Sequence, residues 1–128
     1  MAEPLHALPA TIGVAEFDAL HDEPGRWQGL AAAIAADCGA GPVQPLSAGT
    51  VLVARAGADA ILKLYPPFLR DHCAFERALL GRLHGALTLP TPRLLRTGER
   101  DGWPWQLMTR LPGTTLDAVW DRLDEPAR

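Results

Sequence analysis

Apolar residues recur at two different spacings along this chain, and the spacings predict alternating helices and strand pairs. Over residues 27–38 the apolar positions come every three or four residues, which is the spacing of one helix face. This stripe consists of Trp27, Leu30, Ile34 and Cys38. Asp22 or Glu23, ahead of Pro24, would start the helix, and Gly39 would end it. We expect this helix to pack on a sheet and to carry no chemistry.

Short apolar runs bounded by turn residues predict two antiparallel β-hairpins. The expected strands are residues 51–55 and 61–65 in the first hairpin and residues 93–98 and 103–108 in the second. Turns at residues 57–59 and 100–102 connect them. Nearer the N-terminus, where proline and glycine alternate with short apolar runs, residues 11–14 predict a brief extended piece.

The second strand carries Lys63, which is the single lysine of the sequence. A side-chain period of two places Ile61, Lys63 and Tyr65 on one face of the strand. Leu62 and Leu64 then lie on the other face. An ammonium group in so apolar a strand is costly unless it is paired, so we expect a carboxylate partner.

Residues 68–84 predict an amphipathic helix that supplies this partner. Its apolar stripe consists of Leu69, Cys73, Leu79, Leu80 and Leu83. Glu76 lies within the stripe, thirteen residues after Lys63. A strand lysine held by an inward-facing helix glutamate is the arrangement with which kinases bind nucleotide phosphates. Taken alone, the two residues fit equally well a lysine that reaches solvent and a solvated glutamate.

The predicted order is helix, two strands, helix, two strands, a stiff link at residues 109–113, and a further helix capped by Thr114 or Thr115. This order predicts an α+β fold, in which one helix packs on an antiparallel sheet and an N-terminal helix precedes it. Residues 124–126 read Asp-Glu-Pro, a helix start just before the sequence stops. We therefore expect the chain to be part of something longer.

The formal net charge of −3, with arginines scattered singly, offers no basic stripe for nucleic acid and no polybasic membrane patch. Small molecules or proteins are the expected partners. Cys38 and Cys73 fall at apolar helix positions and predict two buried thiols. No leader-like segment and no stretch of membrane-spanning length is present in the sequence, so a cytoplasmic location is expected.

Several motifs together resemble one known family. They are residues 46–50, residues 61–67, Glu76, residues 90–92, Gly98, residues 107–113 and Trp120. This set is similar to the aminoglycoside phosphotransferases, bacterial relatives of protein kinases and choline kinases. The likeness covers residues 46–123 well and residues 20–45 loosely. It implies an N-terminal extension and helix at residues 1–45, a kinase-like nucleotide-binding lobe at residues 46–113, and the start of a second lobe at residues 114–128.

The resemblance also implies roles for individual residues. Lys63 would bind the α- and β-phosphates of ATP, and Glu76 would orient Lys63. The loop over the phosphates would consist of Ser47, Ala48, Gly49 and Thr50. Val53 and Ile61 would cover the adenine, and Met108 would stand behind it. The hinge whose backbone reads the adenine edge would consist of Thr109, Arg110 and Leu111.

One part of the family pattern is missing. The family's chemistry lies in a His-Gly-Asp-x-x-x-x-Asn stretch and a later metal-binding aspartate, yet this sequence contains no asparagine. Only His21 has an aspartate directly after it, and that site lies before the first predicted strand. The catalytic base and the Mg²⁺ ligands are therefore expected beyond Arg128, and this chain alone is not expected to transfer phosphate.

Three interpretations remain open at this stage. The first is the ATP-binding lobe of a small-molecule kinase, which transfers the γ-phosphate to a hydroxyl of an unidentified acceptor once a second lobe completes it. The second is a stand-alone, inactive kinase-like module with a binding or regulatory role. The third is a small α+β domain with a buried ion pair and no ligand. Under the first two, we expect Trp103, Trp105, Met108 and Trp120 near an open face that a second lobe or a protein partner covers.

Overall fold

The computed structural model of the chain describes residues 5–46, 50–83 and 92–110. The helices are α1 (Val14–His21), α2 (Pro24–Asp37) and α3 (Arg70–Leu83), with a short 3₁₀ turn η1 (Pro67–Leu69) directly before α3. The strands are β1 (Val43–Leu46), β2 (Leu52–Ala56), β3 (Ala60–Leu64), β4 (Leu94–Arg100) and β5 (Trp103–Thr109). The helix expected after Thr114 lies outside the described residues.

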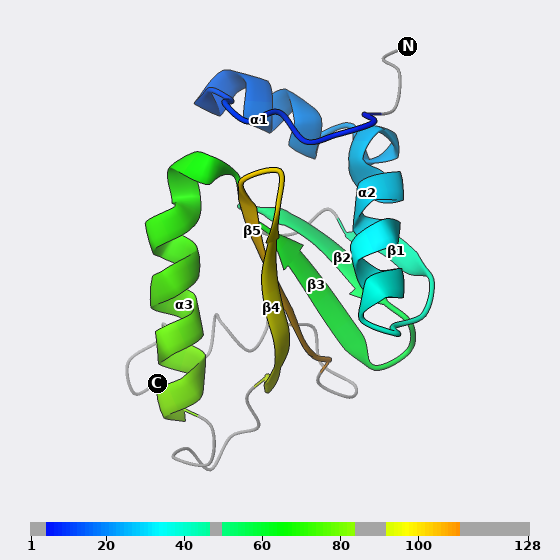
Figure 1. The fold of residues 1–128 in the computed structure, drawn as a ribbon, viewed down its shortest axis with the longest axis vertical. Coiled ribbons are helices and arrows are strands. Elements are labelled where there is room, and N and C mark those ends of the chain that lie inside the picture. Colours follow the sequence, from blue (N-terminus) through cyan, green and yellow to red (C-terminus); the bar gives the residue numbers. More distant parts are fainter. Residues whose placement is uncertain (1–4, 47–49, 84–91, 111–128) are drawn as a thin grey trace, which may run out of the picture.

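The five strands form one antiparallel sheet in the order β1-β2-β3-β5-β4 (Figure 1). The predicted α+β fold with an antiparallel sheet is confirmed, and so are both predicted hairpins. Strand β3 occupies the centre, with β2 on one side and β5 on the other. Lys63 therefore lies in the middle strand, where it pairs in register with Val53 of β2 and Gln106 of β5.

The alternation predicted for β3 separates two apolar clusters on the two faces of the sheet. Leu62 and Leu64 belong to the larger cluster, whose other members come mainly from α1, α2, β2 and β5. Ile61 and Tyr65 belong to the smaller cluster, which α3 completes with Cys73 and Leu80. Helices α2 and α3 thus lie on opposite sides of the sheet (Figure 1). Lys63 shares its face with α3.

Helix α1 begins at Val14, the last residue of the extended piece expected at residues 11–14, whereas Gly13 before it has an extended backbone (φ −85°, ψ 168°). Val14 begins α1, and the Phe17 N–H donates to the Gly13 carbonyl at 2.9 Å to close its first turn. Phe17 and Leu20, three residues apart, are both buried in the larger cluster. Docking of these two side chains outweighs the β-forming tendency of Val14, because tertiary burial routinely overrides local propensity.

The edge strand β1 was not predicted, because Pro45 within it signals a break in the sequence. Every N–H of a central strand points to one of its two neighbouring strands, whereas an edge strand has positions whose N–H would point away from the sheet, and proline is tolerated there. In the structure Pro45 pairs in register with Ala54 of β2 on the only side where β1 has a neighbour within the described sheet.

The β4–β5 hairpin carries two backbone features that local chemistry explains. Asp101 and Gly102 both have positive φ values, 53° and 85°, as a tight turn of the type I′ kind requires. Gly98 pairs with Trp105, and a Cβ atom at position 98 would lie 2.4 Å from Trp105 Cζ2. Only glycine leaves room for the indole to lie across the strand.

The N-terminal segment before α1 is fastened to this hairpin. The Leu8 N–H donates to Asp101 Oδ2 at 3.0 Å, and Trp103 Nε1 donates to the Pro9 carbonyl at 2.8 Å. Trp103 and Trp105 are both buried in the larger cluster beside α1 and α2. The expectation that these two tryptophans lie near an open face is therefore wrong, since the N-terminal helices, on which no motif was found, cover them.

Candidate functional site

The centre of the candidate site is the ion pair between β3 and α3. Lys63 Nζ lies 2.6 Å from Glu76 Oε1, and each residue is only 8% exposed. The predicted pairing of a strand lysine with an inward-facing helix glutamate is confirmed. A lysine that reaches solvent and a solvated glutamate, which the sequence left open, are excluded by this burial.

Local sequence accounts for where each partner lies. Lys63 is held at the middle of a strand whose neighbours on both sides are hydrogen-bonded to it. Glu76 lies one helical step from Cys73 and another from Leu80, and these two side chains anchor α3 in the smaller cluster. The carboxylate is therefore carried inward by the same face that packs the helix.

Two further side chains complete the surroundings of Glu76, and sequence reasoning did not assign them a role. The Tyr65 hydroxyl donates to Glu76 Oε2 at 2.7 Å. Gln106 Nε2 donates to the Tyr65 hydroxyl at 2.9 Å, and both Tyr65 and Gln106 are 0% exposed. A signal for Tyr65 was present, since it shares a strand face with Lys63. Gln106 is an amide in an otherwise apolar strand, a pattern that marks a polar partner inside the core.

The Tyr65 hydroxyl is held in its neutral form. Burial raises the pKa of Tyr65 well above its ordinary value, and the negative charge of Glu76 and the hydrogen bond to it raise this pKa further. The hydrogen bond from Gln106 acts in the opposite direction but does not reverse the shift. Tyr65 therefore remains a hydrogen-bond donor to the carboxylate throughout the physiological range.

The apolar residues predicted to surround an adenine lie on the same sheet face as Lys63. Val53, Ile61 and Met108 are buried together in the smaller cluster. The register aligns Ile61 with Met108 and Val53 with Lys63. The structure thus brings these three predicted residues together beside the ion pair.

The predicted hinge and loop residues are described only in part. The Thr109 N–H donates to the Arg93 carbonyl at 2.9 Å, and the Arg110 N–H donates to the Asp59 carbonyl at 2.7 Å. Both backbone donors are therefore already used within the protein. Thr50 is exposed just before β2. Ser47, Ala48, Gly49 and Leu111 lie outside the described residues.

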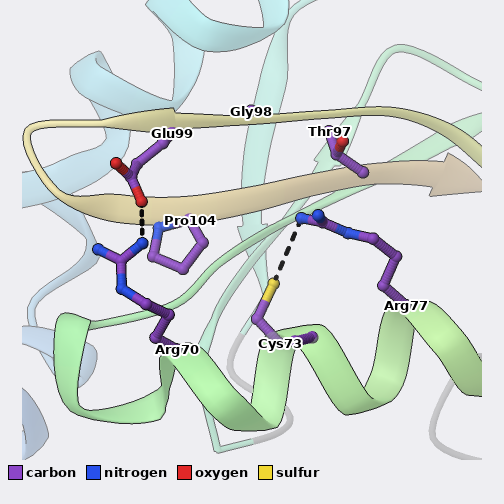
Figure 2. Close-up of a pocket in the computed structure, with 8 residues that line it drawn as sticks. Arg70, Cys73, Arg77, Thr97, Gly98, Glu99 and Pro104 are labelled. Carbon is purple, nitrogen blue, oxygen red and sulfur yellow. Dashed lines mark hydrogen bonds and ion pairs between the residues drawn. The ribbon is translucent and has the colours of Figure 1, made fainter.

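A separate groove of about 380 Å³ lies between α3 and the β4–β5 hairpin (Figure 2). Arg70 spans one end of it, forming an ion pair with Glu99 and donating to the Gly102 carbonyl at 2.7 Å. Arg77 lies along it and makes long contacts, 3.9 Å to Cys73 Sγ and 3.5 Å to Gln106 Oε1. The groove contains none of the residues predicted to contact a nucleotide.

The two thiols differ in their surroundings. Cys73 is buried, as predicted, and burial raises the pKa of its thiol. Cys38 is only partly buried, at the end of α2. Both are free cysteines. Cys73 therefore acts as a small apolar side chain on the buried face of α3, where a reactive thiolate is not favoured.

Residues 5–46, 50–83 and 92–110 contain no group of three or more His, Cys, Asp or Glu side chains placed to hold a metal ion. Within the same ranges, none of the helices has both the length and the apolar character needed to cross a membrane. The location of Mg²⁺ ligands beyond Arg128 stays a prediction.

Comparison with known protein families assigns this chain to one of them. The model of the phosphotransferase enzyme family, APH, matches residues 43–128. This span includes β1 to β5, the ion pair and α3. No curated protein and no solved structure gave a significant match to the chain.

Proposed function

Because the chain belongs to the phosphotransferase enzyme family, we propose that it is the ATP-binding lobe of a small-molecule kinase. The observation that carries this proposal is the buried ion pair between Lys63 and Glu76. A buried ion pair is weak evidence for stability, since apolar residues of similar volume often serve the fold equally well. The position of the pair on one face of a kinase-like lobe is better explained by a ligand that needs a fixed cation.

The role of Lys63 in this proposal is to bind the α- and β-phosphates of ATP. Glu76 holds the ammonium group at one place on the sheet, so the cation is oriented before the nucleotide arrives. A preorganised charge stabilises the phosphates more than a mobile one, because no reorganisation is needed on binding. The loop over the phosphates would consist of Ser47, Ala48, Gly49 and Thr50.

Adenine binds next to Val53, Ile61 and Met108, which already share one face with Lys63. The backbone of Thr109, Arg110 and Leu111 reads the edge of the base. The N–H groups of Thr109 and Arg110 already donate to carbonyl groups of the protein. These two residues would therefore contact the base through their own carbonyl oxygens.

Phosphate transfer requires residues that this chain lacks. We place the base that deprotonates the acceptor hydroxyl, together with the Mg²⁺ ligands, in a second lobe beyond Arg128. Mg²⁺ would neutralise charge on the phosphates when bound. The chain itself contributes the nucleotide position, and thereby the line along which the γ-phosphate meets a small-molecule hydroxyl.

The test compares Lys63→Met with Arg82→Met in the full protein. Arg82 is exposed on α3, so its replacement removes a cation without touching the ion pair. Titration calorimetry with MgATP should show at least about tenfold weaker binding for Lys63→Met and an unchanged Kd for Arg82→Met. Wild-type affinity in Lys63→Met would refute the role of Lys63.

The same titration separates the interpretations that the sequence left open. The kinase interpretation is supported if the protein binds ATP and transfers the γ-phosphate to a compound in a screen of small molecules with hydroxyl groups. ATP binding by a protein in which no base and no Mg²⁺ ligands follow Arg128 supports the inactive module. A wild-type protein that binds no ATP leaves the small domain with a buried ion pair.

A further inference from the structure

The two oxygens of the Glu76 carboxylate have different partners. Oε1 accepts from the Lys63 ammonium at 2.6 Å, and Oε2 accepts from the Tyr65 hydroxyl at 2.7 Å. An ionised carboxylate only accepts hydrogen bonds, so both contacts require the partner to donate. The carboxylate is therefore held at both ends, and rotation about its last bond would break both contacts.

The direction of each hydrogen bond around Tyr65 is determined. A tyrosine hydroxyl has one proton to donate, and Gln106 Nε2 donates into the same oxygen at 2.9 Å. The hydroxyl proton is thus left to point at Glu76. The Gln106 amide is oriented in turn by its oxygen, which accepts the long 3.5 Å contact from Arg77 Nε. The donors run in one sequence, from Gln106 to Tyr65 to Glu76.

The sheet holds this sequence of donors in place. The Tyr65 N–H donates to the Pro104 carbonyl at 2.8 Å, which extends the pairing of β3 with β5. Gln106 lies opposite Lys63 in the same pairing. Three of the groups around the carboxylate, namely Lys63, Tyr65 and Gln106, therefore come from two adjacent central strands. Helix α3 contributes the carboxylate and Arg77, which contacts the Gln106 oxygen.

We propose that Tyr65, supported by Gln106, is a positioning residue that orients Glu76 so that Lys63 is held for the nucleotide phosphates. This inference rests on the proposed function of the Lys63 site. Without the Tyr65 hydroxyl, Oε2 would be a buried carboxylate oxygen with one donor fewer, and the carboxylate could turn away from Lys63. Lys63 would then reach the phosphates from a range of positions, and ATP would bind more weakly.

The test measures MgATP affinity and thermal stability of Tyr65→Phe in the full protein. Phenylalanine keeps the ring in the smaller cluster and removes only the hydroxyl. We expect ATP affinity to fall by up to about tenfold, because a hydrogen bond that is present with and without ATP changes the Kd only as far as it keeps Lys63 oriented. The control is Leu64→Val, which trims the next residue of the strand on the opposite face of the sheet. Leu64→Val should lower the Tm and leave the Kd for ATP unchanged.

A second variant tests the order of the donors. Gln106→Leu removes the donor to Tyr65 without adding charge, and it should weaken ATP binding in the same direction by about threefold. Because Gln106 acts through Tyr65, the double variant should bind ATP no more weakly than Tyr65→Phe alone. Additive effects would overturn the proposed sequence of donors. If Tyr65→Phe does not fold, Gln106→Leu carries the test by itself.

The possible results separate this inference from the proposed function. If wild type binds ATP and Lys63→Met does not, but Tyr65→Phe lowers only the Tm and keeps the wild-type Kd, the positioning role is overturned and the function stands. If wild type binds no ATP, both fail. A weaker Kd in Tyr65→Phe beside an unchanged Kd in Leu64→Val is the supporting result.

Discussion

Removing the charges of the central ion pair one at a time and then together tests how much the pair contributes to the free energy of unfolding. Glu76→Gln leaves the Lys63 ammonium at 8% exposure without its carboxylate. Lys63→Met leaves the Glu76 carboxylate equally buried with the Tyr65 donor. Breaking one side of a buried pair costs about 3–5 kcal/mol, because the remaining charge is desolvated and uncompensated. Each single variant should therefore lose about this much of the free energy of unfolding.

The double variant Lys63→Met with Glu76→Gln should recover most of this loss. Both charges are then absent, and the glutamine oxygen still accepts from the Tyr65 hydroxyl. Replacing a whole buried pair by apolar side chains of similar volume is often neutral or stabilising, and the glutamine NH2 beside the new methionine offsets part of that gain. We expect the double variant to lie within about 1 kcal/mol of wild type. It should nevertheless bind ATP as weakly as Lys63→Met, which would separate the pair's functional role from its role in stability.

Urea unfolding followed by tryptophan fluorescence measures these differences. With a slope of about 2 kcal/mol per M, each single variant should unfold roughly 2 M earlier than wild type. Glu23→Gln is the matched control, since Glu23 pairs with Arg26 at 3.7 Å on the surface and such pairs contribute about 1 kcal/mol or less. Single variants with the wild-type midpoint, or a double variant as unstable as either single one, would refute the reasoning.

Two more predictions follow from particular contacts. Gly98→Ala should lower the free energy of unfolding by about 1–3 kcal/mol, because its Cβ would meet Trp105 Cζ2 at 2.4 Å. Gly29→Ala in α2 should raise the free energy of unfolding by about 0.5–1 kcal/mol, because a Cβ there would meet nothing within 4 Å. Thermal unfolding of both variants checks the opposite signs, and equal shifts would contradict the contact. Tyr65 is the single tyrosine of the chain, so ultraviolet titration reports it alone. Its folded pKa is raised, so its contribution to stability is complete below the unfolded value of about 10 and is lost above it. Tyrosinate absorbance should therefore appear only together with alkaline unfolding, and its appearance in the folded protein would contradict the burial.

The part of the site that could be predicted from sequence is the part set by local pattern. Lys63 stood out as the single lysine, and helical spacing alone placed Glu76 among the leucines. Tyr65 and Gln106 could not be connected in this way. Their contact depends on β3 lying beside β5, and the sequence predicts which strands form hairpins but not which hairpin edges meet.

The same limit applies to the elements that were missed. Helix α1 is short and gains its stability from burying Phe17 and Leu20 against distant parts of the chain. Strand β1 contains Pro45, which is tolerated only because the strand lies at the sheet edge. In both cases the interaction that stabilises the element is with residues far away in sequence. The pattern of neighbouring residues therefore predicts the wrong element or none.

The N-terminal helices make the folding unit larger than the stretch by which the chain is recognised. The family model begins at residue 43, yet residues that precede it pack on one face of the sheet and bury side chains of β2, β3 and β5. A protein trimmed to the matched span would expose Trp103, Leu62 and Leu64 to water and would invite aggregation before any ligand could be tested. Transplanting this sheet into another member of the family therefore requires moving both N-terminal helices with it.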